Sequence, residues 1–433
     1  MPFQKLLYLR EALRNTKLPQ SKLKSIQNKK LLEIIRYSYK NVNYYKNLWK
    51  KFGIKAKDIN CIEDLKKLPP INKKVVLKNY KNFISNEYKK YLNYLHRMPS
   101  FLFMRSTSGT SGVPFKIYFD PFAKNFLDAI YARALLKVGY NPTKPLLYYW
   151  WQQTPQKELY HLLGLYRKIY VPSSWDEEKQ LKIMQTIKPQ YIYYYPSALY
   201  FISRMILYQN VELNFKPKLI ISHAEINTEI MRKTIENAFD TNVYDQYGSN
   251  EFNRIAWECR EKNGYHVDSD SVLVEIVDEN YDEVAPGEIG KILITGLVNK
   301  AIPLIRYEIG DFAIKADDVK HHCGINLPVL FERVEGRVEH SFKKNNKIVT
   351  QRKMFEILLD FFEKKKGVSK FQGFFKTRTN KLTINYIPFD ERLSQKNYFG
   401  SNPKINEHEI ALKKVSKINK NDITGKTLLF EKI

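Results

Sequence analysis

The stretch between about residue 144 and residue 250 alternates short apolar runs with segments of helical period, and this alternation constrains the fold most strongly. The apolar runs predict strands at 146–151, 191–195, 219–222 and 243–247. The segments between them predict helices at 176–188, 197–209 and 227–239, with Ser197 and Asn227 as N-caps of the last two. Such alternation favours a largely parallel sheet covered by helices, whose ligands bind beyond the carboxyl ends of the strands. We therefore expect the loops after Ser222 and Tyr247 to border a site.

The rest of the chain divides around this region. Residues 1–100 read as helices with lysine-rich outer faces. Between about 271 and 314, strands follow one another without helices, at 272–277 and 291–295, and an amphipathic helix is predicted at 354–364. We expect an α/β protein with a helical N-terminal part at 1–100, a core at 101–336 and a small α+β domain at 337–433.

Composition excludes several classes of protein. A chain of 433 residues with 43% apolar and 14% aromatic content can bury a sizeable core in two or three domains. No apolar run reaches the roughly 18 residues of a spanning helix, and the N-terminus lacks the features of a secretory signal. Three cysteines cannot form a disulfide framework in a chain of this length. They indicate a reducing compartment, so we expect a cytoplasmic protein.

The charge balance is strongly basic, with 72 Lys and Arg against 45 Asp and Glu, a net charge of +27. The lysines are spread along the whole chain, which indicates compositional drift. The alternative is peripheral contact with a membrane or another polyanion. No zinc-finger, RNA-binding or recognition-helix pattern occurs, so we expect no nucleic-acid partner.

Residues 105–114, with the sequence RSTSGTSGVP, combine several hydroxyl side chains with two glycines. Glycine lets the backbone approach an anion, and backbone N–H groups together with hydroxyls can surround phosphate oxygens. The spacing is not that of a Walker loop. Taken alone, the segment is equally consistent with an ordinary turn.

Three later segments carry residues suited to a nucleotide. After a predicted strand, Tyr247 offers a flat face for a purine and Glu251 offers a carboxylate for Mg²⁺. In the segment 302–311, the carboxylate of Asp311 can accept both hydroxyls of a ribose. Further on, Gly336 permits a hinge and Arg337 can pair with a phosphate. Each of these segments alone also fits a structural role.

The order of these motifs, followed by a late Gly-Lys pair, resembles that of the ANL superfamily of acyl-CoA synthetases and adenylation domains. Within it, the sequence looks most like the phenylacetate-CoA ligase group, including its CapK-like relatives found with capsular polysaccharide genes. The segment KKLPPINK at 66–73 resembles that group's helical entry region, and KPQYIYYYPSAL at 188–199 resembles its strand and turn. The resemblance implies a large N-terminal domain with helix-covered, mostly parallel sheets and a small, mobile C-terminal domain.

The resemblance also implies roles for individual residues. The β- and γ-phosphates of ATP would contact Thr107, Ser108, Gly109, Thr110, Ser111 and Gly112. The remaining nucleotide contacts would come from Ala224, Glu225, Tyr247, Gly248, Ser249, Asn250 and Asp311. Glu251 would hold Mg²⁺, Arg337 would lie near the phosphate or ribose, and Lys426 would bridge the α-phosphate and the substrate carboxylate. The acyl group would lie where the strand ends at 148–153, 193–197 and 223 converge. The residues expected to contact it there are Tyr195, Ser197 and His223.

Several residues depart from the pattern of the group. Phe115 follows the loop proline where lysine or threonine is common, and Asn250 replaces a hydroxyl residue before the glutamate. Alanine replaces glycine at position 224, and Glu339 and His340 replace the acidic pair after the GR motif. These departures leave open a relative that binds nucleotide without catalysis.

A second constellation combines two of the three cysteines with two histidines: Cys259, His266, His321 and Cys323. Two thiolates and two imidazoles suit tetrahedral zinc, and four protein ligands leave no open position. The resembling group often has cysteines where His321 and Cys323 stand. We expect a structural zinc site here, against the alternative of scattered, metal-free residues.

The resemblance implies activation of a carboxylate by Mg·ATP to an acyl-adenylate, followed by transfer to a nucleophile, with coenzyme A as the default acceptor. An amine or hydroxyl is the alternative if the protein serves surface polysaccharide assembly. A homodimer is a further expectation. A basic scaffold on a membrane or polyanion is the competing non-enzymatic interpretation.

Overall fold

The computed structural model describes residues 2–92, 102–106, 116–151, 159–317, 321–345, 347–365, 367–379, 381–390, 392, 404–405, 408–421 and 425–433. The predicted phosphate loop, Thr107 to Gly112, and Phe115 lie outside the described residues. The chain forms two compact units, each built from two stretches. The first unit is Met1–Val138 with Gln246–Arg333, and the second is Gly139–Asp245 with Val334–Ile433. These units divide the chain differently from the domains expected from the sequence.

The N-terminal part of the first unit is helical, as expected. Its helices are α1 (Pro2–Asn15), α2 (Gln20–Asn41), α3 (Asn43–Lys51), α4 (Lys73–Lys78), α5 (Tyr80–Phe83), α6 (Asn86–Leu92) and α7 (Pro121–Lys137), with short 3₁₀ turns at Ala56–Asp58 and Ile62–Lys67. The helical spacing of Leu31, Ile34 and Ile35 places all three on the buried face of α2. Asp120 caps α7, since its carboxylate accepts the backbone N–H of Ala123 at 2.9 Å.

The sheet of the first unit contains β1 (Ile71–Asn72), β9 (Asn253–Glu258), β10 (Tyr265–Val267), β11 (Val272–Val277), β12 (Ile289–Gly296) and β13 (Tyr307–Lys315). Parts of β8 (Val243–Ser249) and β14 (Val329–Arg337), along which the chain passes between the units, complete it in the order β11-β12-β13-β14-β10-β9-β8. Neighbouring strands are antiparallel in the pairs β11–β12, β12–β13, β14–β10, β10–β9 and β9–β8. A separate hairpin joins β2 (Phe103–Ser106) to β3 (Lys116–Phe119), on either side of the phosphate loop.

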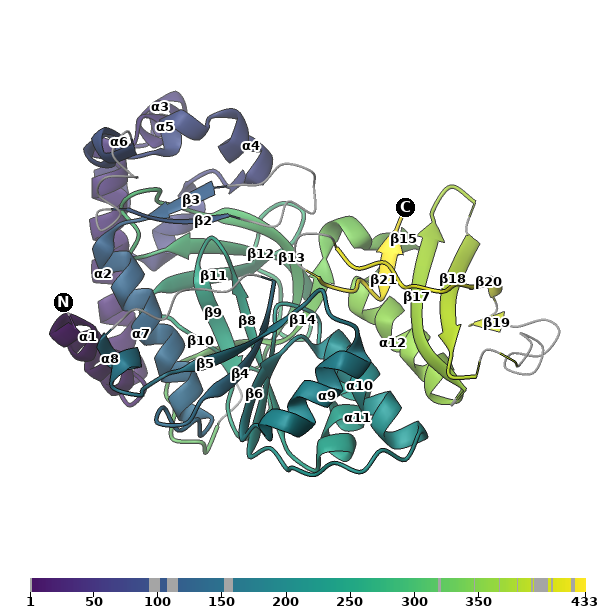
Figure 1. Cartoon of the computed structure of the whole chain (residues 1–433). Coiled ribbons are helices and arrows are strands. Elements are labelled where there is room, and N and C mark those ends of the chain that lie inside the picture. Colours follow the sequence, from purple (N-terminus) through teal and green to yellow (C-terminus); the bar gives the residue numbers. More distant parts are fainter. Residues whose placement is uncertain are drawn as a thin grey trace. The chain divides into compact units, whose positions relative to one another are not determined.

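The second unit contains the parallel sheet that the strand–helix alternation predicts. Its strands β4 (Leu146–Trp150), β5 (Lys168–Pro172), β6 (Tyr191–Tyr194) and β7 (Leu219–His223) pair in parallel in the order β7-β6-β4-β5. The helices that pack beside these strands are α9 (Glu177–Ile187), α10 (Pro196–Tyr208) and α11 (Glu229–Phe239), after the short α8 (Leu159–Leu162) (Figure 1). Strand β5 was not expected from the sequence.

The two predicted N-caps are wrong. Tyr195 precedes α10 and makes no side-chain cap, and Ser197 lies inside the first turn. Thr228, one residue after Asn227, caps α11 by accepting the N–H of Met231 at 3.2 Å. The side chain of Asn227 instead donates to the hydroxyl of Ser222 at 3.0 Å. This bond takes the place of a hydrogen bond to the helix N-terminus.

The C-terminal part of the second unit is a small α+β layer. Helix α12 (Gln351–Glu363) lies along a sheet of β17 (Val368–Lys376), β18 (Lys381–Pro388), β19 (Lys404–Ile405), β20 (His408–Lys414) and β21 (Phe430–Lys432) (Figure 1). A hairpin of β15 (Phe342–Lys344) and β16 (Lys347–Val349) precedes the helix. Residues of α12, β17 and β21 share one apolar core with residues of β4, β6, α10 and α11. The C-terminal part is therefore packed against the parallel-sheet region of the same unit.

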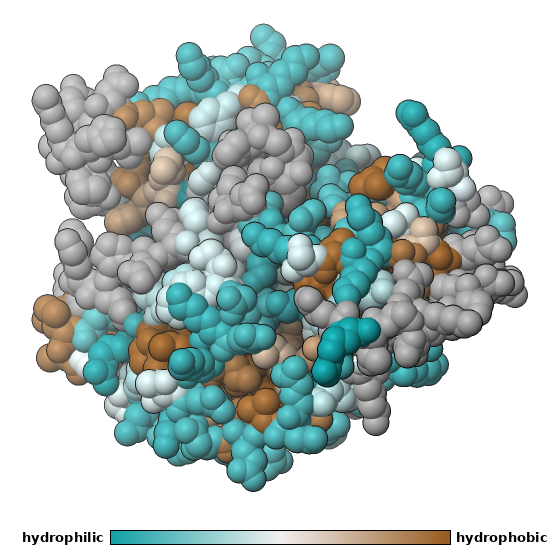
Figure 2. All heavy atoms as spheres, turned by 45° about the vertical axis from the view of Figure 1, so that its right-hand side comes forward, coloured by the Kyte–Doolittle hydropathy of each residue, from teal (hydrophilic) through white to brown (hydrophobic). Residues whose placement is uncertain are grey.

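No helix among the described residues is both long and apolar enough to cross a membrane. The face drawn in Figure 2 is mostly hydrophilic, with smaller apolar areas between the polar side chains.

Candidate active site

The end of β7 carries the first group of predicted residues. His223 is its last residue, and Ala224 follows with a φ of 66°, in the left-handed region that favours glycine. An L-residue in this conformation costs roughly 1–2 kcal/mol. This explains why the resembling group places glycine here and why alanine, the smallest substitute, stands at this position.

Glu225, the next residue, is tied to the start of α10. Its carboxylate accepts the backbone N–H of Ser197 at 3.1 Å and the Ser197 hydroxyl at 2.6 Å. Burial raises the pKa of Glu225, while Lys426 and the bonds from Ser197 act in the opposite direction. Glu225 thus satisfies a free N–H group at a helix N-terminus, a position that favours a carboxylate.

Lys426 reaches the same strand end from the C-terminal part of the chain. Its ammonium group donates to the carbonyl of Ala224 at 2.7 Å and lies 5.6 Å from the centre of the Tyr195 ring. The late lysine, 202 positions away in sequence, is therefore in contact with the residues predicted to lie beside the adenine and the acyl group.

Aromatic rings surround His223. The Tyr193 ring stacks on its imidazole at 3.9 Å between centroids, Trp150 stacks at 5.7 Å, and Tyr195 meets it edge-on at 5.1 Å. The Tyr195 hydroxyl is buried and has no hydrogen-bond partner among the described residues. Burial raises the pKa of Tyr195 well above its usual value, so this hydroxyl stays a proton donor. Tyr195, Ser197 and His223 thus lie together, as expected from the sequence.

The second group of predicted site residues, those for the adenine, the ribose and Mg²⁺, lies in the first unit. The hydroxyl of Tyr247 donates to the carboxylate of Asp311 at 2.7 Å, which brings the predicted adenine and ribose residues together. Glu251 is buried, and the Tyr307 hydroxyl lies 3.4 Å from one of its carboxylate oxygens. A Cβ at Gly248 would collide with the backbone of Asn253, so only glycine fits this turn.

Asn250 connects this segment to strand β2, which precedes the predicted phosphate loop. Its side-chain amide donates to the carbonyl of Ser106, the last residue of β2, at 3.0 Å. The substitution of a hydroxyl residue by asparagine therefore adds a bond to the strand from which the loop begins. Ser249 accepts the N–H of Phe252 at 3.2 Å and closes the turn.

The GR pair lies at the start of the C-terminal part. Gly336 has a φ of 93°, and a Cβ there would meet Ile226 at 2.6 Å and Gln351 at 2.7 Å. The next residue, Arg337, is exposed, and its backbone N–H donates to the side chain of Gln351 at 3.0 Å. This close approach requires glycine at 336 whether or not the segment is a hinge.

The four predicted zinc ligands converge in the first unit. The ligand atoms of Cys259, His266, His321 and Cys323 all lie within 4.8 Å of one another. The Cys259 sulfur is 3.3 Å from Nδ1 of His321, and the Cys323 sulfur is 3.4 Å from Nε2 of His266. Tetrahedral zinc with ordinary bond lengths separates sulfur and nitrogen ligands by about 3.6 Å. These two sulfur–nitrogen distances are close to that separation, and the four side chains converge on one point of the first unit.

The surroundings act differently on the histidine and the cysteine side chains of this cluster. Nδ1 of His266 lies 2.7 Å from the carbonyl of Leu327, which makes it the protonated nitrogen and directs the lone pair of Nε2 into the cluster. Burial lowers the pKa of His266 to about 4, so its imidazole is neutral at pH 7. Burial also raises the pKa of Cys259 to about 12.

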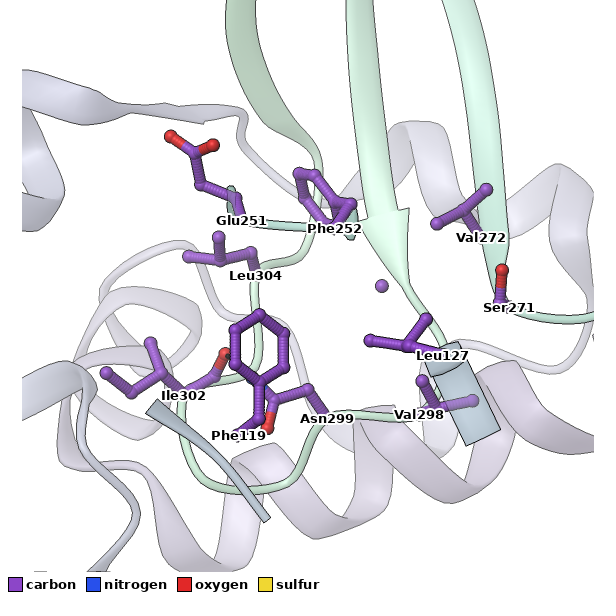
Figure 3. Close-up of a pocket in the computed structure, with 11 residues that line it drawn as sticks. Phe119, Leu127, Glu251, Phe252, Ser271, Val272, Val298, Asn299, Ile302 and Leu304 are labelled. Carbon is purple, nitrogen blue, oxygen red and sulfur yellow. Dashed lines mark hydrogen bonds between the residues drawn. The ribbon is translucent and has the colours of Figure 1, made fainter. Parts of the chain in front are cut away.

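An apolar pocket of about 10 Å³ lies in the first unit, lined by Leu127, Phe252, Val272, Val298 and Leu304 among others (Figure 3). This volume holds about one water molecule. It is therefore too small to be the acyl site.

Comparisons with known proteins agree with the predicted group. No family model matches the chain. Protein CapK of Staphylococcus aureus is 24% identical over 347 residues, covering 76% of this chain and 69% of its own length. The phenylacetate-coenzyme A ligase of Thermus thermophilus is 26% identical over 306 residues, covering 68% of this chain and 66% of its own.

Among solved structures, a 2-hydroxyisobutyryl-CoA ligase in the postadenylation state, bound to 2-HIB-AMP, matches with a TM-score of 0.75 and 16% identity. The match covers 97% of this chain and 91% of that one. The α/β fold of the adenylate-forming ligases, with a small C-terminal sheet, is thereby confirmed, as is the resemblance to the phenylacetate-CoA ligase group.

Proposed function

We propose that this protein is an AMP-forming acid ligase, which activates a carboxylic acid with ATP and passes the acyl group to a nucleophile. The contact between Lys426 and the Ala224 carbonyl carries this proposal. It places a cation beside His223, Tyr195 and Glu225, the residues to which the resemblance assigns the acyl group and the adenine. The fold and the named relatives support the same reaction class.

In the first half-reaction, a carboxylate oxygen of the acid attacks the α-phosphorus of ATP. The bond to the bridging oxygen breaks, and pyrophosphate leaves. Two anions must approach each other, so the ammonium group of Lys426 acts by neutralising charge where it develops. The buried Tyr195 hydroxyl is a donor for the substrate carboxylate. Asp311 and Tyr247 would bind the ribose and the adenine, and Glu251 would hold Mg²⁺, since hard cations favour carboxylate oxygen.

In the second half-reaction, the nucleophile attacks the acyl carbonyl carbon and AMP leaves. Coenzyme A is the acceptor proposed here, its thiol proton passing to solvent. An amine or hydroxyl acceptor is the alternative. It is motivated by the similarity to Protein CapK, whose name, unlike those of the other relatives, specifies no coenzyme A ligase. Arg337 would act near the phosphate, and residues after Gly336 would move between the two half-reactions. A cytoplasmic location, where ATP and coenzyme A are both available, is part of this proposal. Contact with a membrane surface and a homodimer stay predictions.

The reaction is tested by exchange of labelled pyrophosphate into ATP, measured with a panel of carboxylic acids that includes phenylacetate. Acid-dependent exchange is expected with at least one acid, and coenzyme A should then convert that acid to its thioester. Nucleotide binding without exchange for any acid in a broad panel would contradict the proposal and favour a catalytically inactive relative.

We also propose that Cys259, His266, His321 and Cys323 hold a structural zinc ion. The convergence of two thiols and two imidazoles from the end of β9, from β10 and from the segment after residue 320 supports this proposal, with Cys259 directly following β9. The ion would join these segments of the first unit, and four protein ligands would leave no position for substrate.

Metal analysis of the purified protein tests the site, with about one zinc per chain expected. The variant Cys259→Ser should lose the metal. The matched control Cys61→Ser should keep it, since Cys61 lies outside the cluster. A metal content near zero in the unaltered protein would exclude the site.

A further inference from the structure

A buried carboxylate, Glu177, lies where the C-terminal part of the chain packs on the start of α9. Its side chain is 1% exposed and forms ion pairs with two lysines. Lys370 comes from β17, and Lys420 comes from the segment that leads to Lys426. A charge is rarely buried to this extent unless it is paired. The pairing therefore accounts for the position of Glu177 and connects α9 to two C-terminal segments.

Hydrogen bonds from side chains of β4, α9 and β6 fix the segment that carries Glu177. The Tyr149 hydroxyl donates to the carbonyl of Ser173 at 3.0 Å, and the Gln180 amide donates to the carbonyl of Trp175 at 2.6 Å. Gln180 is itself fixed by the Tyr194 hydroxyl at 2.8 Å. As the first residue of α9, Glu177 also benefits from the free N–H groups of the helix N-terminus. The carboxylate is thus a rigid anchor.

The segment bearing the proposed catalytic lysine is bound to this anchor. The Lys420 ammonium lies 2.9 Å from the Glu177 carboxylate and donates to the carbonyl of Trp175 at 3.0 Å. The backbone N–H of Asn421 donates to the carbonyl of Lys426 at 2.8 Å, and the N–H of Gly425 donates to the carbonyl of Asn421 at 2.7 Å. These two bonds connect Asn421, the neighbour of Lys420, to Gly425 and Lys426.

Gly425 lets this segment approach the anchor closely. Its φ is 67°, and a Cβ at this position would collide with Ser173. Ser173 belongs to the same fixed stretch as Trp175 and Glu177. Residues 420–421 and 425–426 are therefore seated on residues 173–177 by one ion pair, one hydrogen bond to a carbonyl and one close backbone contact.

We propose that Glu177 is a positioning residue for adenylate formation, which seats residues 420–421 and 425–426 so that the ammonium group of Lys426 lies at the Ala224 carbonyl. The role of Lys426 in this proposal rests on the proposed function, whereas the seating of the segment rests on geometry alone. The proposed function assigns Lys426 to the first half-reaction, so loss of the anchor should affect adenylate formation selectively. A purely structural ion pair would weaken both half-reactions together.

Glu177→Gln removes the charge and keeps the shape of the side chain, and Lys420→Gln removes the cation on the other side. Glu177→Asp keeps the charge, so its amide exchange and pyrophosphate exchange should lie between those of the unaltered protein and those of Glu177→Gln. Glu178→Gln is the matched control, because Glu178 is the exposed neighbour on the same helix turn. Two quantities are measured on the full chain. One is hydrogen exchange of the amides in 416–429, and the other is the rate of each half-reaction, the second with a supplied acyl-adenylate and coenzyme A.

Both charge-removing variants should speed amide exchange in 416–429 by about tenfold or more, the effect of losing a hydrogen bond to a charged group. Pyrophosphate exchange should fall by a similar factor, while thioester formation from the supplied adenylate stays within about twofold. Unchanged amide exchange in both variants overturns the seating. Faster amide exchange with an equal fall in both half-reactions overturns the positioning role. If the unaltered protein shows no pyrophosphate exchange with any acid, the proposed function fails, and the amide exchange still decides the seating.

Discussion

Arg204 offers a quantitative test of how the C-terminal helix α12 is held in the second unit. Its guanidinium group is completely buried on α10. It donates to the carbonyls of Phe362, Lys365 and Val368 at 3.2, 3.2 and 2.8 Å, and to the Glu363 carboxylate at 3.1 Å. These acceptors lie at the end of α12 and the start of β17, where helix carbonyls have no partner within the helix. Arg204 therefore satisfies the C-terminus of α12 from outside.

Arg204→Ala removes these four bonds and leaves buried carbonyls unpaired. Breaking a buried ion pair costs about 3–5 kcal/mol. The Glu363 side chain is 28% exposed, and water can partly replace its partner, so the lower end of about 3 kcal/mol is expected. This corresponds to roughly a hundredfold increase in the opening constant of α12.

Hydrogen exchange of the α12 amides measures this opening constant directly, without requiring the two units to unfold together. Arg392→Ala is the matched control, since Arg392 is exposed and its ion pair within the described part of the chain is with Asp390, two residues away. The control should leave α12 unchanged. An increase of less than about fivefold in Arg204→Ala would refute the account of how α12 is held, because fivefold is about 1 kcal/mol.

Three further predictions follow from the site geometry. Gly425→Ala should lower pyrophosphate exchange at least about tenfold in a folded protein, because the added Cβ collides with Ser173 in a left-handed conformation; an active variant would contradict the close approach. Asp311→Ala should raise the KM for ATP about tenfold, the effect of losing a hydrogen bond to a charged group, while the exposed Asp317→Ala should not; equal KM values would remove Asp311 from the nucleotide site. Burial raises the pKa of Glu177, but Lys370 and Lys420 outweigh burial and hold the pKa in the folded protein below 4.5. The ionised Glu177 therefore stabilises the folded protein above pH 4.5, and this stabilisation is lost as the pH falls through the folded pKa. Urea midpoints measured between pH 6 and pH 3 should therefore fall more in the unaltered protein than in Glu177→Gln, and parallel curves would contradict this.

Features that depend on local pattern could be predicted from the sequence. The strands β4, β6, β7 and β8 start at the predicted residues, because buried parallel strands read as apolar runs. The convergence of Cys259, His266, His321 and Cys323 could be predicted because cysteine is rare in this chain and two of its three copies have a histidine close by in sequence. In both cases the information lies within a few neighbouring residues.

Features that depend on long-range competition could not be predicted. Ser197 looks like an N-cap, but it bonds to Glu225, 28 positions away. Glu177 looks like an ordinary acidic residue at a helix start, which the helix dipole alone would explain. Its partners Lys370 and Lys420 are two among 72 basic residues, and only the fold selects them. The packing of α12 on α10 through Arg204 could not be predicted either, because its partners lie about 160 positions away in sequence.

Acid-dependent exchange of labelled pyrophosphate into ATP, compared between the unaltered protein and Lys426→Ala, is the decisive test of carboxylate activation by this protein. Lys417→Ala is the matched control, because Lys417 is an exposed lysine nine residues earlier in the same C-terminal stretch. The account predicts near-complete loss of exchange in Lys426→Ala, with the fold intact, and full exchange in the control. Unchanged exchange in a folded Lys426→Ala protein would contradict it.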